Sequence, residues 1–124
     1  MRRSLLALFL IVSMGVLPAH AHAPSPGPNG GLKVDAGANH HIELVVAGTE
    51  QVSVYLFDAA DQPVPAAGYS GNAILLIDGS PQRFALTPSE GNRLIGTSPA
   101  PVPQGVKGAV QIAAPDGTTA QAKF

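Results

Sequence analysis

The chain has 124 residues and a formal net charge of −1, with 14 glycines, 12 prolines and no cysteine. Its length allows one domain or two very small ones. A charged fraction of only 12% without a basic cluster argues against nucleic acid as the partner, and 45% apolar residues are too many for a disordered chain. Long helices are not expected from so few charged and aromatic residues, which leaves a small globular domain punctuated by glycine and proline.

Residues 1–21 have the pattern of a secretory signal peptide. Arg2 and Arg3 precede an apolar run over residues 5–17, and Ala19-His20-Ala21 places small residues at the positions that signal peptidase prefers. The run is shorter than the roughly 20 residues that a membrane-spanning helix needs. We therefore expect an exported, periplasmic protein with no membrane-spanning segment once the signal is removed.

The expected cleavage follows Ala21, with Ala19 and Ala23 as alternatives that the sequence leaves open. Cleavage after Ala21 removes two basic residues. The exported chain then has five basic and eight acidic residues, so its net charge is −3. Both methionines, Met1 and Met14, also leave with the signal. The exported chain then contains no sulfur, so it must fold without the disulfides that many small exported domains use.

Residues 22–31 are expected to form a Pro/Gly-rich tether ahead of the folded domain. Three prolines and three glycines among residues 23–31 disfavour both a strand and a helix. Prolines also favour extended backbone, so the tether would be partly rigid.

From residue 32 onward, apolar and polar residues alternate with the period of two that is typical of β-strands. Asp78-Gly79 and Pro115-Asp116-Gly117 have the composition of hairpin turns. The pattern predicts an all-β domain over residues 32–124, an immunoglobulin-like β-sandwich of about seven antiparallel strands. The expected strands lie at residues 32–36, 41–46, 52–57, 73–77, 82–86, 93–96, 106–112 and 118–124.

All four histidines lie in the first third of the chain. Cleavage after Ala21 would make His22 the first residue. Its free amine and its imidazole could then chelate a metal ion, and a second imidazole could complete a site of three nitrogen ligands. Cleavage after Ala19 would instead give His20-Ala21-His22, a sequence whose third-position His binds Cu(II) or Ni(II) in a square plane. Cleavage after Ala23 removes both options, and the histidines would then only suit the end of a signal peptide.

His40-His41-Ile42-Glu43 opens the first strongly patterned strand. Alternation places His41 and Glu43 on one face, about 6–7 Å apart, where they can offer two ligands to one metal. The tether is long enough to fold back and bring His22 to His40 or His41. The alternative interpretation is an ordinary solvated strand edge. The candidate metal ligands are therefore His22, His40, His41 and Glu43.

The missing sulfur narrows the choice of metal. Cu(I) sites favour Cys and Met, whereas imidazole, amine and carboxylate ligands suit Cu(II) or Zn(II), with Ni(II) and Co(II) left open. Catalysis is not expected, because the chain has no G-x-S-x-G, P-loop or dinucleotide motif and all its histidines lie in one N-terminal cluster. No organic cofactor is expected either.

Several short stretches resemble small exported proteins of Gram-negative bacteria that are associated with heavy-metal efflux, and the extra domain of some periplasmic adaptor subunits of metal-exporting pumps. The stretches are Pro28-Asn29-Gly30-Gly31, Asp35-Ala36-Gly37, His41-Ile42-Glu43-Leu44-Val45, Val54-Tyr55-Leu56-Phe57-Asp58, Asn92-Arg93-Leu94-Ile95-Gly96 and Gln121-Ala122-Lys123-Phe124. The resemblance implies a periplasmic, metal-linked role, with His41 and Glu43 at matching positions and His22 matching a frequent His ahead of the Pro-Gly segment. It also implies an efflux-pump adaptor as partner. A second exported copper family shares the small β-sandwich and the N-terminal His, but not these strand motifs.

Two functional hypotheses follow. The first is a periplasmic protein that binds a divalent metal through His22, His40 or His41, and Glu43, and that buffers the metal or delivers it to an efflux partner. The second is a structural or protein-interaction module of the cell envelope that binds no metal.

Overall fold

The computed structural model describes residues 22–124, which form nine strands and no helix. The predicted signal peptide, residues 1–21, lies outside the described residues. The described part of the chain contains no helix long and apolar enough to cross a membrane. The strands are β1 (Ser25–Pro26), β2 (Leu32–Ala36), β3 (His40–Val45), β4 (Gln51–Asp58), β5 (Ser70–Ile77), β6 (Ser80–Pro88), β7 (Arg93–Thr97), β8 (Lys107–Ala113) and β9 (Thr119–Lys123).

Strands β2 to β9 form where the apolar alternation predicts them, and the short β1 was not predicted. The turns between the strands follow local chemistry. The β5–β6 hairpin turns through Asp78 and Gly79, whose φ angles are 51° and 77°. Two positive φ angles in a two-residue loop match the twist of the flanking strands, and Asp-Gly tolerates them. The predicted hairpin at Asp78-Gly79 is thus confirmed.

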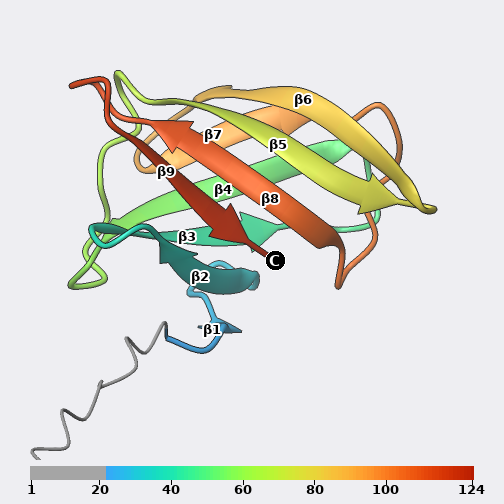
Figure 1. Cartoon of the computed structure of the whole chain (residues 1–124), viewed down its shortest axis with the longest axis horizontal. Coiled ribbons are helices and arrows are strands. Elements are labelled where there is room, and N and C mark those ends of the chain that lie inside the picture. Colours follow the sequence, from blue (N-terminus) through green and yellow to red (C-terminus); the bar gives the residue numbers. More distant parts are fainter. Residues whose placement is uncertain (1–21) are drawn as a thin grey trace, which may run out of the picture.

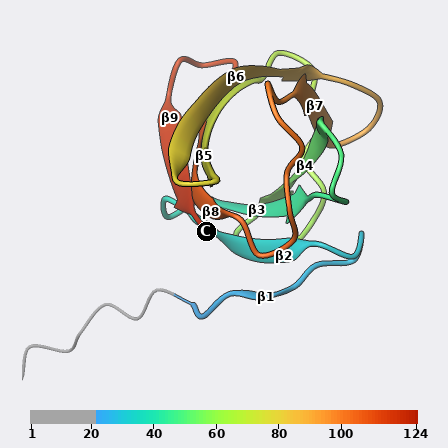
Figure 2. The same ribbon diagram turned by 90° about the vertical axis from the view of Figure 1, so that its right-hand side faces the viewer.

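Every strand pairs antiparallel with its neighbours, and eight of them close into a β-barrel (Figure 1). The order is β2-β3-β4-β7-β6-β5-β8-β9, and a pairing of Ala36 with Ala122 joins β9 back to β2. Viewed from the end, the strands form a ring, with β1 outside it beside β2 (Figure 2).

The predicted immunoglobulin-like sandwich is therefore wrong, although the all-β class is right. A sandwich would leave two separate sheets, β2-β3-β4-β7 and β6-β5-β8-β9, facing each other. Here hydrogen-bonded pairing joins them at two seams, between β6 and β7 (Thr87 with Ile95) and between β2 and β9. Closure in this way removes the open sheet edges that a sandwich retains.

Glycine allows the close approach at one of these seams. A Cβ at Gly96 on β7 would lie 2.5 Å from the carbonyl oxygen of Ala85 and 2.9 Å from Leu86 Cδ2. Glycines inside strands commonly mark such close approaches and bends. A side chain at position 96 would therefore press against β6 at this seam.

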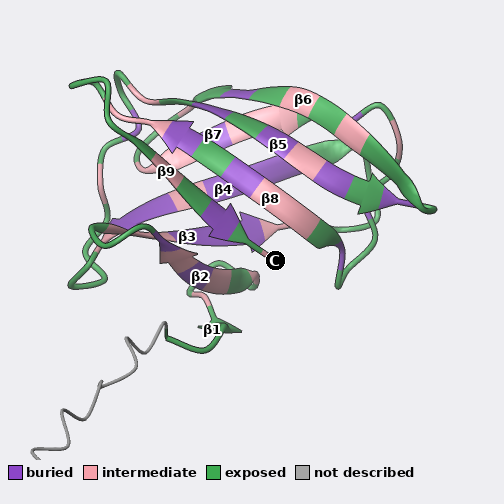
Figure 3. Cartoon of the chain, in the orientation of Figure 1, coloured by how far each residue is buried: buried purple, intermediate pink, exposed green. Residues whose placement is uncertain are grey.

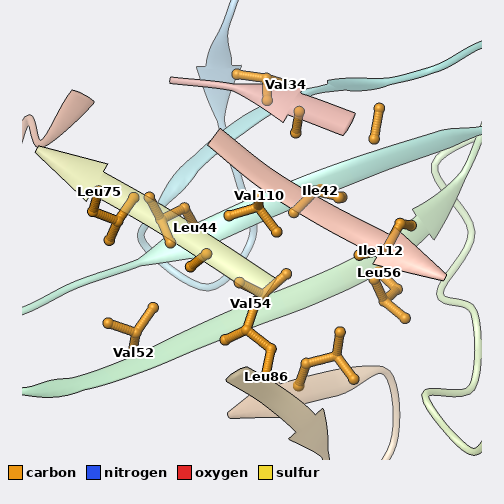
Figure 4. Packing of buried hydrophobic residues seen from close by; sticks show 14 of the residues in the cluster. Val34, Ile42, Leu44, Val52, Val54, Leu56, Leu75, Leu86, Val110 and Ile112 are labelled. Carbon is orange, nitrogen blue, oxygen red and sulfur yellow. The ribbon is translucent and has the colours of Figure 1, made fainter. Parts of the chain in front are cut away.

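The barrel interior is filled by the inward-facing residues of the strands (Figures 3 and 4). On β3, Ile42 and Leu44 are buried in this core, so His41 and Glu43 lie on the outer face, as their alternation predicts. The buried core residues are Val34, Ala36, Ile42, Leu44, Val52, Val54, Leu56, Ala66, Ala73, Leu75, Ile77, Leu86, Leu94, Val102, Val106, Val110, Ile112 and Ala122.

The N-terminal segment contains a short strand that was not expected in the Pro/Gly-rich tether. Ser25 and Pro26 form β1, which pairs with Lys33 and Leu32 of β2. After β1 the chain turns through residues 27–31, where the N–H of Gly27 donates to the carbonyl of Gly31 at 2.9 Å. This arrangement returns the beginning of the described chain to the outer face of the barrel.

Candidate metal centre

The centre lies on the outer face of β2 and β3, and strand register assembles its base. Asp35 of β2 pairs directly with His41 of β3. Directly opposed residues in an antiparallel pair present their side chains on the same face. Because the neighbouring Val34 and Ile42 are buried in the core, Asp35 and His41 both point outward.

His22 completes the group from the N-terminal segment. Its Nδ1 lies 3.4 Å from Asp35 Oδ1, and its backbone nitrogen lies 3.0 Å from Asp35 Oδ2. His41 contacts the same carboxylate oxygen, with Nε2 3.0 Å from Asp35 Oδ1. One ligand atom from each of the three residues lies within 4.8 Å of the other two. Three stretches of the chain thus converge on one carboxylate.

The second ring nitrogen of His41 is occupied by Asp61. His41 Nδ1 lies 2.6 Å from Asp61 Oδ1, and Lys33 Nζ lies 3.0 Å from the same oxygen. A carboxylate on one imidazole nitrogen keeps the proton there and leaves the other nitrogen to bind a metal. Hydrogen bonds from His41 and then Lys33 hold the pKa of Asp61 below its ordinary value of 3.8.

A tight turn after β4 positions Asp61. Asp58 Oδ1 accepts hydrogen bonds from the N–H groups of Ala60 and Gln62, each at 2.9 Å. Asp61 itself has a φ of 61° and donates its N–H to the carbonyl of Asp58 at 3.0 Å. Asp is one of the few residues that adopt this left-handed conformation readily, so the turn directs its carboxylate at the barrel wall.

The group borders a hollow of about 360 Å³ that remains open to solvent. The side chain of His22 is 80% exposed, whereas those of His41 and Asp35 are 14% and 27% exposed. The centre therefore has a fixed base on the barrel and an accessible outer ligand.

The three residues could hold a metal ion. Zn(II) ligands at about 2.0–2.2 Å from the ion in a tetrahedron lie about 3.3–3.6 Å apart. The separations of 3.0 and 3.4 Å from Asp35 Oδ1 to the two imidazoles fall close to that range. Two imidazole nitrogens and a carboxylate oxygen suit Zn(II) and Cu(II), and the described residues supply no thiolate or thioether for Cu(I).

Two of the sequence-predicted ligands, His22 and His41, meet at this centre, and His40 does not. His40 Nε2 forms a hydrogen bond of 2.9 Å with the hydroxyl of Tyr69. Burial raises the pKa of Tyr69 above its ordinary value, and the negative charge of Asp116 raises it further. His40 thus belongs to a separate polar contact at the start of β3.

Glu43 also lies apart from the group of His22, Asp35 and His41, although it shares a face with His41. Its side chain is fully buried, and its carboxylate accepts hydrogen bonds from Asn29 and Gly31. The carboxylate that faces the histidines is that of Asp35 instead.

Sequence reasoning missed Asp35 and Asp61. The signal for Asp35 was present, because a hairpin centred on residues 37–39 places residues 35 and 41 opposite each other. Asp61 depends on the left-handed turn after β4 and has no comparable signal in strand alternation.

No family model matches the chain, and comparisons with curated proteins and with solved structures find no significant similarity.

Proposed function

We propose that the protein binds a divalent metal ion, Cu(II) or Zn(II), through His22, Asp35 and His41. The observation that carries this proposal is the convergence of three ligand atoms within 4.8 Å of one another. The Asp61–His41 contact supports it, since a carboxylate behind a coordinating imidazole is a common arrangement in metal sites.

Removal of a signal peptide after Ala21 would add a further ligand. The backbone nitrogen of His22 would become a free amine, and it lies beside the same Asp35 carboxylate as the imidazole of His22. An amine and an imidazole of one residue form a chelate, and nitrogen-rich sites favour Cu(II) over Zn(II). Processing at this position would thus favour copper.

The exposure of His22 supports a role in metal exchange rather than in folding. Structural zinc sites usually have a closed shell of four protein ligands, whereas this centre has a hollow on one side. We infer a periplasmic buffer or carrier, without enzymatic activity, that passes its metal to an efflux partner such as a pump adaptor subunit.

Metal titration of the exported protein, with its N-terminus fixed by intact mass, tests the proposal. Cu(II) and Zn(II) should bind with one-to-one stoichiometry, and His41→Ala should weaken binding strongly. His40→Ala is the matched control, because His40 is adjacent on β3 but bonds to Tyr69. A wild-type Kd weaker than roughly 10 µM, or about −7 kcal/mol, for both metals would contradict metal binding. The interaction-module hypothesis would then replace it.

A further inference from the structure

Glu43 is the one acidic residue of the described chain whose whole surface is buried. It lies on the outer face of β3, so the barrel core does not bury it. Residues 27–31 cover it instead, since a Cβ added at Gly27 would lie 2.1 Å from Glu43 Cδ. The burial of this carboxylate therefore depends on the N-terminal segment.

The turn gives both carboxylate oxygens donors. Asn29 donates its backbone N–H to Oε2 at 2.9 Å and its side-chain amide to Oε1 at 2.9 Å. The N–H of Gly31 donates to Oε2 at 2.8 Å. A buried carboxylate is costly unless it is hydrogen-bonded in this way, and bonds to a charged acceptor are stronger than neutral ones. We call the Glu43 carboxylate with Asn29 and Gly31 the Glu43 latch.

The glycines of the turn are needed for the segment to lie this close. A Cβ at Gly31 would lie 2.2 Å from the carbonyl oxygen of Leu44, and Gly30 has a φ of 83°. The Pro28-Asn29-Gly30-Gly31 sequence thus has the residues that the latch requires, rather than only those of a flexible spacer.

The latch fixes the path of the chain toward His22. Gly27 follows β1 directly, and β1 has only two residue pairs with β2. A free segment of ten residues, numbers 22–31, would have an end-to-end distance of about 17 Å. The ligand atoms of the metal centre all lie within 4.8 Å of one another. Without the latch, only the two β1 pairs and its own contact with Asp35 would hold His22 at the centre.

We propose that Glu43 is the positioning residue of the metal centre: the Glu43 latch holds the N-terminal segment on the barrel and so keeps His22 over Asp35 and His41. This inference rests on the proposed metal-binding function. It gives Glu43 an indirect role in place of the direct coordination expected from the sequence.

The first test uses the metal-free protein. Glu43→Gln keeps the size of the side chain but replaces one carboxylate oxygen with an NH₂ group. That group cannot accept the hydrogen bonds that Asn29 and Gly31 donate. The amides of Asn29 and Gly31 should lose their protection from hydrogen exchange by tenfold or more, while those of the barrel strands keep theirs. Glu90→Gln, on an exposed glutamate, is the matched control and should change neither. Unchanged protection of both amides in Glu43→Gln would overturn the latch.

The second test is a double-mutant cycle of Cu(II) or Zn(II) affinity. Glu43→Gln should weaken binding by about 10- to 100-fold, as for other residues that orient metal ligands. In a His22→Ala background it should change affinity by less than about twofold, because the ligand through which it acts is gone. An equal loss in both backgrounds would show a general effect on the fold and contradict positioning.

Two further outcomes separate this inference from the proposed function. If the wild type binds no metal, the proposed function and the positioning role both fail, while hydrogen exchange still decides whether the latch holds the segment. If Glu43→Gln does not fold, Asn29→Ala removes one side-chain donor and leaves both backbone donors. A smaller loss of affinity, again absent without His22, is then expected, and wild-type affinity would overturn the inference.

Discussion

Asp61→Asn tests how the barrel prepares His41 for a metal. The carboxylate of Asp61 lies 2.6 Å from His41 Nδ1 and leaves Nε2 facing Asp35. Asn has the same shape and tolerates the φ of 61° at this position, so the turn should persist. Losing such a carboxylate typically weakens metal binding by 10- to 100-fold. Because the Asp61 side chain is 51% exposed and water screens its charge, we expect the lower end, about tenfold.

Isothermal titration with Zn(II) at neutral pH measures this effect. Asp78→Asn is the matched control, because Asp78 also has a positive φ, 51°, but lies in the β5–β6 hairpin. Its Kd should stay within about twofold of the wild type. A wild-type Kd for Asp61→Asn would refute the proposed orienting contact. A loss as large as that of His41→Ala would also refute it, since Asp61 would then be a ligand itself.

Three other predictions follow from the fold. Leu94 is fully buried, so Leu94→Ala should lower the free energy of unfolding by about 3 kcal/mol. Leu76→Ala, at a half-exposed site, should lower it by less than about 0.5 kcal/mol. Urea denaturation measures both free energies. Gly96→Ala should lower the free energy of unfolding by about 1–3 kcal/mol in the same assay, because the added Cβ would press on the β6–β7 seam. Unchanged stability would contradict that close approach. Thr118→Val should raise the pKa of Asp116 toward 3.8 in an NMR titration, because Thr118 Oγ1 donates to that carboxylate at 2.6 Å. The lowered pKa of Asp116 stabilises the folded state above pH 3.8, and this contribution disappears as the pH falls through the pKa of the folded state. The variant lacks this contribution, so it should lose less stability in acid. An unchanged Asp116 pKa in the variant would contradict this prediction.

The strands could be predicted from the sequence, but the closure of the barrel could not. Alternation places Ile42 and Leu44 inside and His41 outside in a sandwich and in a barrel alike. The two architectures differ in whether β6 bonds to β7 and β2 to β9. The β2–β9 pairing joins residues far apart in the chain, Ala36 and Ala122. The β6–β7 pairing is local, but the close packing at Gly96 beside it appears only in three dimensions.

The candidate site could be predicted only in part, because strand patterns indicate its residues on the barrel but not how the N-terminal segment folds over them. His22 and His41 were found because all the histidines lie in the first third of the chain and imidazole suits a transition metal where sulfur is absent. Asp35, which was missed, follows from the register of one hairpin. Glu43 was assigned to the metal because it shares a face with His41. Its burial depends on residues 27–31 folding back over β3, which a Pro/Gly-rich composition does not indicate.

In the proposed function, one metal ion binds between the N-terminal segment and the outer face of the barrel. Anomalous diffraction at the metal edge, from crystals of the Cu(II)- or Zn(II)-loaded protein, tests it most directly. We predict a single strong peak about 2.0–2.2 Å from His22 Nδ1, His41 Nε2 and an oxygen of Asp35, with Glu43 still bound to Asn29 and Gly31. A peak at His40 or Glu43 instead, or no ordered peak at all, would contradict the account.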